Sequence, residues 1–185
     1  MSLKSVYKEY FHIGAAVPGA AFEHPAALRH LKEQYTSVTC ENDMKPERIL
    51  DEKRNRSEPE KYDRSPAVDF SGVGKYLDFA RDNGIQMRGH TLVWHAQTPR
   101  WFFTRGYDAR EDAPLADRDV MLSRLEHYIA VVMGFVQTEY PGIVYAWDVV
   151  NEAVDEGGLR DSLWLQTIGE DYILQAFSFA RKYAA

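Results

Sequence analysis

The chain alternates four times between two apolar patterns, and this alternation limits the folds that it can adopt. Short continuous apolar runs predict strands, and apolar residues at positions i, i+3, i+4 and i+7 predict helices. The predicted strands cover residues 11–17, 37–40, 85–94 and 143–147. They are followed in turn by helical patterns at residues 27–35, 73–83, 122–136 and 173–180. Strands that alternate with helices require right-handed crossovers, so we predict an α/β fold with a parallel sheet.

Two further stretches bear on what is buried in this fold. Residues 143–147 are continuously apolar and follow Pro141-Gly142, which predicts a strand buried on both faces, as in a parallel sheet. Residues 51–65 are dense in charged side chains and contain Pro59. We interpret this second stretch as a solvated loop rather than a binding segment.

Composition excludes several classes of function. With 185 residues, of which 45% are hydrophobic, the chain is long enough to bury a core as one domain over residues 1–185. The net charge of -6 is spread along the chain, which predicts no nucleic-acid or membrane partner and favours a neutral ligand. Cys40 is the single cysteine, no apolar run is long enough to span a bilayer, and no signal-peptide core is evident. We therefore expect a cytoplasmic protein, or a secreted one if a signal segment has been removed.

Polar side chains gather where three of the predicted strands end. They are Glu41, Asn42, Asp43 and Lys45 after the second strand, His90, Trp94, His95 and Gln97 at the third, and Asn151 and Glu152 after the fourth. Because the carboxyl ends of parallel strands meet at one edge, we predict a binding or catalytic site there. At this level, capping of the next helix is an equally good interpretation of Asn151 and Glu152.

Strand alternation gives a first prediction of how the third cluster is arranged. It places His90, Leu92 and Trp94 on one face and His95 on the other, so the two histidines do not form a metal pair. We predict no metal or cofactor, and interpret His95 as a packing residue. Lys45 and Glu41 are compatible with a surface ion pair of little energetic consequence.

Three segments of the chain resemble one enzyme family. The strings TCENDMKPE, RGHTLVWHAQTPRW and WDVVNEAV occur in order at the predicted strand ends. They are similar to the second, third and fourth strand ends of glycoside hydrolase family 10, the retaining endo-1,4-β-xylanases, and the likeness extends through the flanking helices. The resemblance implies a (β/α)8 TIM barrel. Residues 1–185 would be its amino-terminal half, with the first four β/α units.

The resemblance also implies a role for each matching residue. Glu152 would be the general acid/base, and Asn151 would bind the sugar 2-hydroxyl in subsite -1. The other substrate-binding positions would be Glu41, Asn42, Lys45, His90, Trp94 and Gln97. Asp148 would hold His90 and tune Glu152. From residue types alone, Glu41 and Glu152 would be paired as two catalytic carboxylates, but the resemblance places Glu41 at a sugar-binding position.

The sequence departs from the family in one respect that concerns catalysis. The family nucleophile belongs to a Thr-Glu-Leu-Asp type motif near the seventh strand, and no such motif occurs in this chain. A retaining mechanism needs two carboxyl groups about 5 Å apart. We therefore expect the isolated chain to be inactive and to need a carboxyl-terminal half-barrel, or to pair with a second copy. The alternatives are a non-catalytic xylo-oligosaccharide-binding fragment, one subunit of a split enzyme, and a β-glycanase of other specificity.

Overall fold

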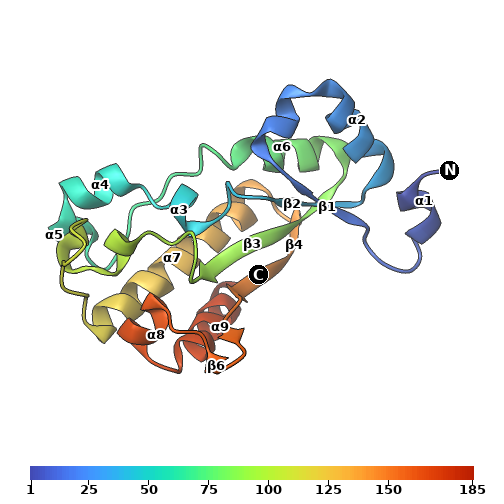
Figure 1. Cartoon of the computed structure of the whole chain (residues 1–185). Coiled ribbons are helices and arrows are strands. Elements are labelled where there is room, and N and C mark those ends of the chain that lie inside the picture. Colours follow the sequence, from blue (N-terminus) through green and yellow to red (C-terminus); the bar gives the residue numbers. More distant parts are fainter.

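The computed structural model describes residues 1–185 and is built on a parallel sheet. Its strands are β1 (Gly14–Val17), β2 (Ser37–Cys40), β3 (Gln86–Trp94) and β4 (Val144–Asn151), and they lie side by side in chain order (Figure 1). All three neighbouring pairs are parallel. The predicted α/β order is confirmed. The first strand is shorter than predicted, and the fourth runs on to Asn151, so the sheet itself delivers that residue to the strand ends.

Helices and 3-10 turns connect these strands. The helices are α1 (Leu3–Tyr7), α2 (Pro25–Gln34), α3 (Pro46–Ile49), α4 (Glu52–Ser57), α5 (Pro59–Tyr62), α6 (Gly74–Asn83), α7 (Arg118–Glu139), α8 (Leu163–Ile168) and α9 (Tyr172–Tyr183). The 3-10 turns are η1 (Gly19–Glu23), η2 (Arg100–Phe103) and η3 (Arg105–Tyr107). The four predicted helices are confirmed as α2, α6, α7 and α9. No helix combines the length and the apolar character that crossing a bilayer requires.

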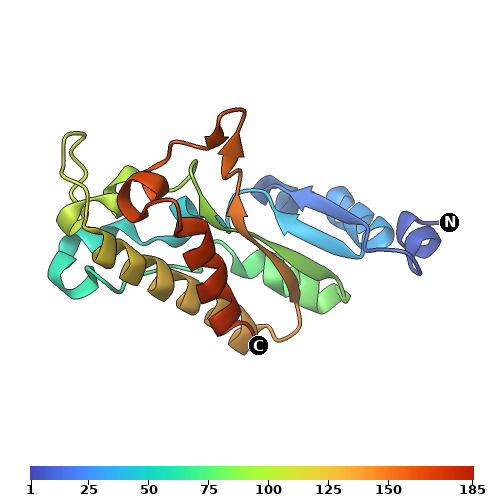
Figure 2. The same ribbon diagram turned by 90° about the horizontal axis from the view of Figure 1, so that it is seen from below.

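A small antiparallel hairpin follows β4. It consists of β5 (Val154–Asp155) and β6 (Gly158–Leu159), and it stands out from the body of the molecule beyond the end of β4 (Figure 2). Figure 2 also shows α9 lying along α7, and the two helices are in contact. Apolar side chains of α6, α7 and α9 join those of β2 and β3 in one core.

The fourth strand is not buried on both faces, so that prediction is wrong. Tyr145 is 43% exposed, and it lines an open hollow of about 600 Å³ together with Arg88 and Asp148. Side chains from β1 and β2 line the same hollow. One face of the sheet is therefore packed against the core, whereas the hollow leaves part of the other face open.

Simple alternation along β3 is also wrong. Thr91, Leu92 and Val93 are all fully buried, and the pairing of β3 with β4 shifts in register between His90 and Val93. Leu92 packs among apolar residues from other segments, including Leu50. A register shift inserts extra backbone into one strand, so side-chain direction cannot be counted in twos across it.

Residues 51–65 are not a solvated loop, contrary to the prediction. They form α4 and α5, and Asn55 between the charged positions is fully buried. Its amide Nδ2 donates to the carbonyl of Ala67 at 2.8 Å, and its Oδ1 accepts from the backbone N–H of Ala67 at 2.8 Å. Most charged side chains of this segment are exposed, while Asn55 and Tyr62 are buried and join it to the body of the molecule.

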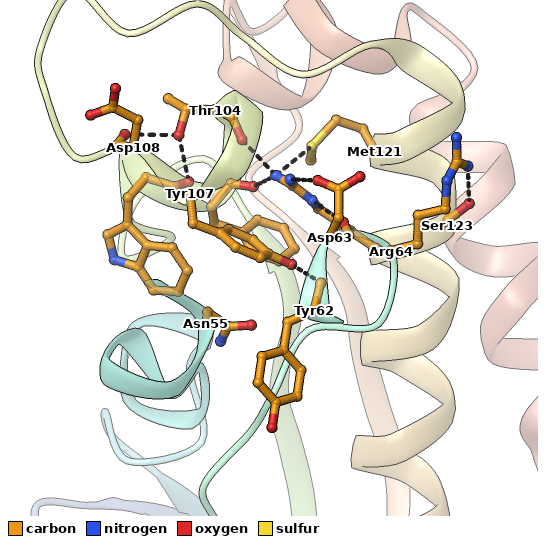
Figure 3. A network of polar contacts seen from close by, with 12 residues as sticks. Asn55, Tyr62, Asp63, Arg64, Thr104, Tyr107, Asp108, Met121 and Ser123 are labelled. Atoms are coloured by element: carbon orange, nitrogen blue, oxygen red, sulfur yellow. Dashed lines mark hydrogen bonds and ion pairs between the residues drawn. The ribbon is translucent and has the colours of Figure 1, made fainter. Parts of the chain in front are cut away.

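A buried arginine joins this segment to the loop after β3. The guanidinium of Arg124 is fully buried, and its Nη1 donates to the carbonyls of Phe102 at 2.6 Å and Thr104 at 2.9 Å. Its Nη2 donates to Oδ1 of Asp63 at 2.8 Å, and the group lies 4.1 Å from the ring centre of Tyr107. Figure 3 shows Asp63, Thr104 and Tyr107 of this network. This network anchors the loop that begins at the carboxyl end of β3.

Gly89 provides a test of the packing between β3 and β4. A Cβ at Gly89 would lie 2.3 Å from Cε3 of Trp147, on the paired strand. We expect Gly89→Ala to lower the free energy of unfolding by about 1–3 kcal/mol, measured by chemical denaturation, because overpacking forces neighbours to shift. Gly134→Ala is the control, since its Cβ meets nothing within 4 Å in helix α7. That change should stabilise the chain by about 0.5–1 kcal/mol. Unchanged stability of Gly89→Ala would contradict the observed packing.

Candidate active site

The three polar clusters lie at the same edge of the sheet. Because β2, β3 and β4 run parallel, their carboxyl ends point the same way. The register pairs Trp94 with Asn151, so Glu152 follows at the tip of β4 next to the end of β3. Residues more than fifty positions apart in the chain are thereby neighbours.

Glu152 is held by a tryptophan from the adjacent strand. Its Oε2 accepts a hydrogen bond of 3.1 Å from the indole Nε1 of Trp94, while the side chain stays 54% exposed. Glu152 has φ of +50°, in the left-handed region that favours glycine, and such strain in a non-glycine residue is concentrated at functional sites. Nε of Arg160 donates to the carbonyl of Glu152 at 3.1 Å, which ties this backbone to the base of the β5–β6 hairpin.

The helix-capping interpretation of Asn151 and Glu152 is wrong. Asn151 is the last residue of β4, and a hairpin follows it rather than a helix. The next helix, α8, is capped by Ser162, whose hydroxyl accepts from the N–H of Leu165. The carboxyl group of Glu152 therefore does not cap a helix.

A second cluster surrounds a nearly buried lysine. Lys45 is 7% exposed, and its Nζ donates to Oε1 of Gln97 at 2.7 Å and to Oδ1 of Asn42 at 3.0 Å. The same Nζ lies 4.7 Å from the ring centre of Trp94. No ion pair joins Lys45 to Glu41, so the surface ion-pair interpretation is wrong. Lys45 instead connects the ends of β2 and β3, and through Trp94 it connects to Glu152.

The third cluster centres on a carboxylate held by an arginine and a histidine. Oδ2 of Asp148 lies 3.0 Å from Nδ1 of His90, and both Nε and Nη2 of Arg88 donate to the same carboxyl group. Burial by itself would raise the pKa of Asp148, but the hydrogen bonds from Arg88 and His90 outweigh it and leave the pKa below its usual range. An ionised carboxylate has only acceptors, so it fixes Nδ1 of His90 as the donor and turns Nε2 away from Asp148.

Part of the predicted site lines the open hollow beside these clusters. Glu41, Lys45, His90 and Asp148 all line it. Asn42 and Gln97 bond to Lys45 in its lining. Trp94, Asn151 and Glu152 do not line the hollow: Trp94 contacts Lys45, pairs with Asn151 and bonds to Glu152. The side chains of His, Cys, Asp and Glu form no group of three or more that could hold a metal ion. The arrangement offers hydrogen-bonding groups and a flat aromatic side chain beside one exposed carboxyl group.

Two contacts near these clusters were not predicted. Nε2 of His95 lies 3.9 Å from Oε2 of Glu152, although His95 was interpreted as a packing residue. Arg88 carries the ion pair with Asp148, and its only sequence signal is its place two residues before His90 on the same strand. Neither contact follows from local sequence, because each depends on the β3–β4 register.

Comparison with known proteins places the chain in a family. The family model for glycosyl hydrolase family 10 matches residues 2–185. The chain belongs to this family. It is 57% identical over its whole length to endo-1,4-β-xylanase B of Butyrivibrio fibrisolvens, and 42% identical over 98% of its length to endo-1,4-β-xylanase A of Thermotoga maritima. It covers only 29% and 16% of those two relatives.

Solved family 10 structures give the fold. An intracellular xylanase of Thermoanaerobacterium saccharolyticum matches 98% of the chain with a TM-score of 0.83 and 37% identity, and the chain covers 53% of it. The Clostridium thermocellum xylanase 10B modules in complex with xylohexaose match with a TM-score of 0.91 and 33% identity, and 38% of that chain is covered. These family 10 neighbours are TIM barrels, and the four-stranded parallel sheet of this chain corresponds to their first four β/α units.

The charge on Asp148 can be tested through pH. A carboxyl group with a lowered pKa in the folded state stabilises the fold above its unfolded pKa of about 3.9, and this contribution is lost as pH falls through the folded value. We expect Asp148→Asn to reduce the free energy of unfolding by about 1–3 kcal/mol at pH 7, with a smaller difference from the native chain below about pH 4.

Asp119→Asn is the matched control for this measurement. Asp119 pairs with Arg64 at 2.6 Å, but both side chains are more than half exposed, so its removal should have little effect at either pH. Denaturation profiles at pH 7 and pH 3 make the comparison. An Asp148→Asn effect that is equal at both pH values would contradict the ionic role.

Proposed function

We propose that residues 1–185 form the amino-terminal half of the catalytic barrel of a retaining endo-1,4-β-xylanase, acting on xylan or xylo-oligosaccharides. The observation that carries this proposal is the carboxyl group of Glu152, held by Trp94 next to the cluster of Lys45, Asn42 and Gln97. The names of the relatives support the reaction, and the xylohexaose and xylotriose complexes of solved neighbours support the substrate class. The intracellular xylanase among those neighbours supports a cytoplasmic location.

In this proposal Glu152 acts as general acid and then as general base. Its exposed carboxyl group protonates the glycosidic oxygen as the bond breaks, and afterwards takes a proton from the attacking water. The indole N–H of Trp94 fixes one carboxyl oxygen, which leaves the other for proton transfer. Asn151 would bind the 2-hydroxyl of the sugar in subsite -1, where hydrogen bonds strengthen in the transition state.

The remaining groups would bind the sugar. Trp94 offers an apolar face to a sugar ring, and His90, held by Asp148, presents Nε2 to ring hydroxyls. Lys45 has a third N–H besides its bonds to Asn42 and Gln97, and it can donate that one to a hydroxyl. Glu41, which lines the hollow, would accept hydrogen bonds from xylose hydroxyls.

A second carboxylate must come from outside these 185 residues. The family nucleophile would be supplied by the carboxyl-terminal half-barrel, either as a further part of the same polypeptide or as a second subunit. Because the proposed glycone-binding groups lie within this chain, a non-catalytic xylo-oligosaccharide-binding role is the second candidate. The chain spans about half the length, or less, of the relatives cited above, which is compatible with either arrangement.

The acid/base role predicts a difference between two kinds of substrate. In an enzyme completed by the carboxyl half, Glu152→Ala should lower kcat/KM on xylan by about 10²–10⁴-fold, because the leaving sugar needs a proton. An aryl xylobioside with a good leaving group needs no protonation, so its bond cleavage should be far less affected. Glu156→Ala, in the exposed turn of the hairpin, is the control and should leave both rates unchanged. Equal losses on both substrates would contradict the role of Glu152.

The edges of the sheet predict how the 185-residue chain assembles. β1 pairs only with β2, and β4 only with β3, so each leaves one edge of backbone groups without a strand partner. We expect the purified chain to associate, either with a carboxyl half-barrel or with a second copy of itself. A self-dimer should be folded but inactive on xylan. Two-fold symmetry would place the second Glu152 at the eighth strand position, whereas the family nucleophile lies at the seventh. Adding the carboxyl half should recover activity.

Sedimentation and xylan hydrolysis test this assembly. A compact, cooperatively folding monomer at micromolar concentration would contradict the importance of the open edges. Hydrolysis of xylan by the chain alone would contradict the need for a second carboxylate.

A further inference from the structure

The loop that carries Asn42 and Lys45 is fixed to helix α6 by Asp43, which lies between them in the sequence. Oδ2 of Asp43 accepts a hydrogen bond of 2.7 Å from the hydroxyl of Tyr76 on α6. Nζ of Lys75 lies 3.5 Å from the same oxygen. Asp43 turns toward helix α6, while Asn42 and Lys45 bond to each other and to Gln97.

Tyr76 is a rigid partner for this bond. It is fully buried, and the ring of Phe22 from η1 packs edge-on against it at 4.8 Å between centroids. Burial raises the pKa of the Tyr76 hydroxyl, and the hydrogen bond to Asp43 raises it further. The hydroxyl therefore stays protonated and acts as the donor to the carboxylate.

The turn after β1 closes over the same contact. A Cβ at Gly19 would lie 3.0 Å from Nζ of Lys75 and 3.2 Å from Oδ2 of Asp43, so the backbone there passes directly over the pair. The Asp43–Tyr76 bond thus lies where the segments that follow β1 and β2 meet α6.

Backbone hydrogen bonds hold the two ends of the same loop. The N–H of Glu41 donates to the carbonyl of Val17 at 3.1 Å, and the N–H of Glu47 donates to the carbonyl of Gln97 at 2.8 Å. Between these points, the side chain of Asp43 connects the loop to α6. Loss of this bond would free the segment that presents both Asn42 and Lys45.

We propose that Asp43 is a positioning residue for sugar binding, whose hydrogen bond with Tyr76 sets the geometry of Asn42 and Lys45 relative to Gln97. Asp43 itself is 24% exposed and points to α6 rather than to the hollow, so it acts through its neighbours. This assignment rests on the proposed function for its meaning, but the geometric effect can be measured without sugar.

The test compares two tyrosines, each of which donates a hydrogen bond from its hydroxyl to an aspartate. Tyr76→Phe removes the bond to Asp43, and Tyr140→Phe removes the 3.2 Å bond to Asp78, elsewhere on α6. The experiment uses the 185-residue chain in the oligomeric state that sedimentation has determined. In this chain Tyr76→Phe should shift the side-chain amide NMR signals of Asn42 and Gln97. It should also weaken xylobiose binding about fivefold, the scale of a partly lost charge-assisted hydrogen bond. Tyr140→Phe should do neither.

Asp43→Asn keeps an acceptor for the hydroxyl of Tyr76. Its amide NMR signals and its xylobiose affinity should therefore differ less from those of the native chain than the values for Tyr76→Phe do. Unchanged amide signals in folded Tyr76→Phe, or equal shifts in Tyr140→Phe, would overturn the proposal. If Tyr76→Phe does not fold, Asp43→Ala provides the same comparison from the loop side, and unchanged Asn42 and Gln97 signals there would overturn it. Absence of xylobiose binding to the native chain would contradict the sugar-binding role proposed for the isolated chain, and the amide signals would still test the positioning role of Asp43.

Discussion

The parallel pairing of neighbouring strands is the constraint on which every feature of the site depends. It brings the carboxyl ends of β2, β3 and β4 to one edge, and the β3–β4 register then sets Trp94 opposite Asn151. The 3.1 Å bond between Trp94 and Glu152 exists only in this register. A one-residue slip would turn the side chains of β4 to the other face and separate the two groups.

The site keeps charge in places where a purely structural domain would have apolar groups. Lys45 is nearly buried, and its environment supplies two amide oxygens and an aromatic ring in place of water. Asp148 is likewise held between Arg88 and His90. Buried polar groups cost free energy unless they are bonded, and replacing them by well-packed apolar groups is often neutral or stabilising. Retaining them is consistent with a ligand that needs hydrogen-bond donors and acceptors.

The sequence was a good guide wherever local chemistry decides structure. Apolar periodicity gave the four strands and the long helices, and the polar residues at strand ends gave the clusters around Lys45 and Glu152. It failed where tertiary contacts decide. The charges of residues 51–65 concealed a buried Asn55, and a register shift ended the alternation at Leu92. The continuous apolar run of β4 suggested burial on both faces, but Tyr145 lines an open hollow.

The sequence also did not predict which side chains contact each other across neighbouring strands. The contacts of Arg88 with Asp148 and of His95 with Glu152 join residues that lie far apart in the chain, and no spacing rule signals them. The resemblance to family 10 gave the candidate site residues, and the structure adds how their side chains are held. The buried Arg124 network shows the same limit, because its carbonyl acceptors at Phe102 and Thr104 carry no sequence signal.

The central claim is that the strand ends of this chain bind xylo-oligosaccharide. NMR titration of the folded chain with xylobiose tests it most directly, because the indole N–H of each tryptophan gives a separate signal. We predict that millimolar xylobiose shifts the indole signal of Trp94 and the side-chain amides of Asn42 and Gln97, while the indole of the buried Trp101 stays in place. Absence of any shift in these three groups at that concentration, with the fold intact, would contradict the account.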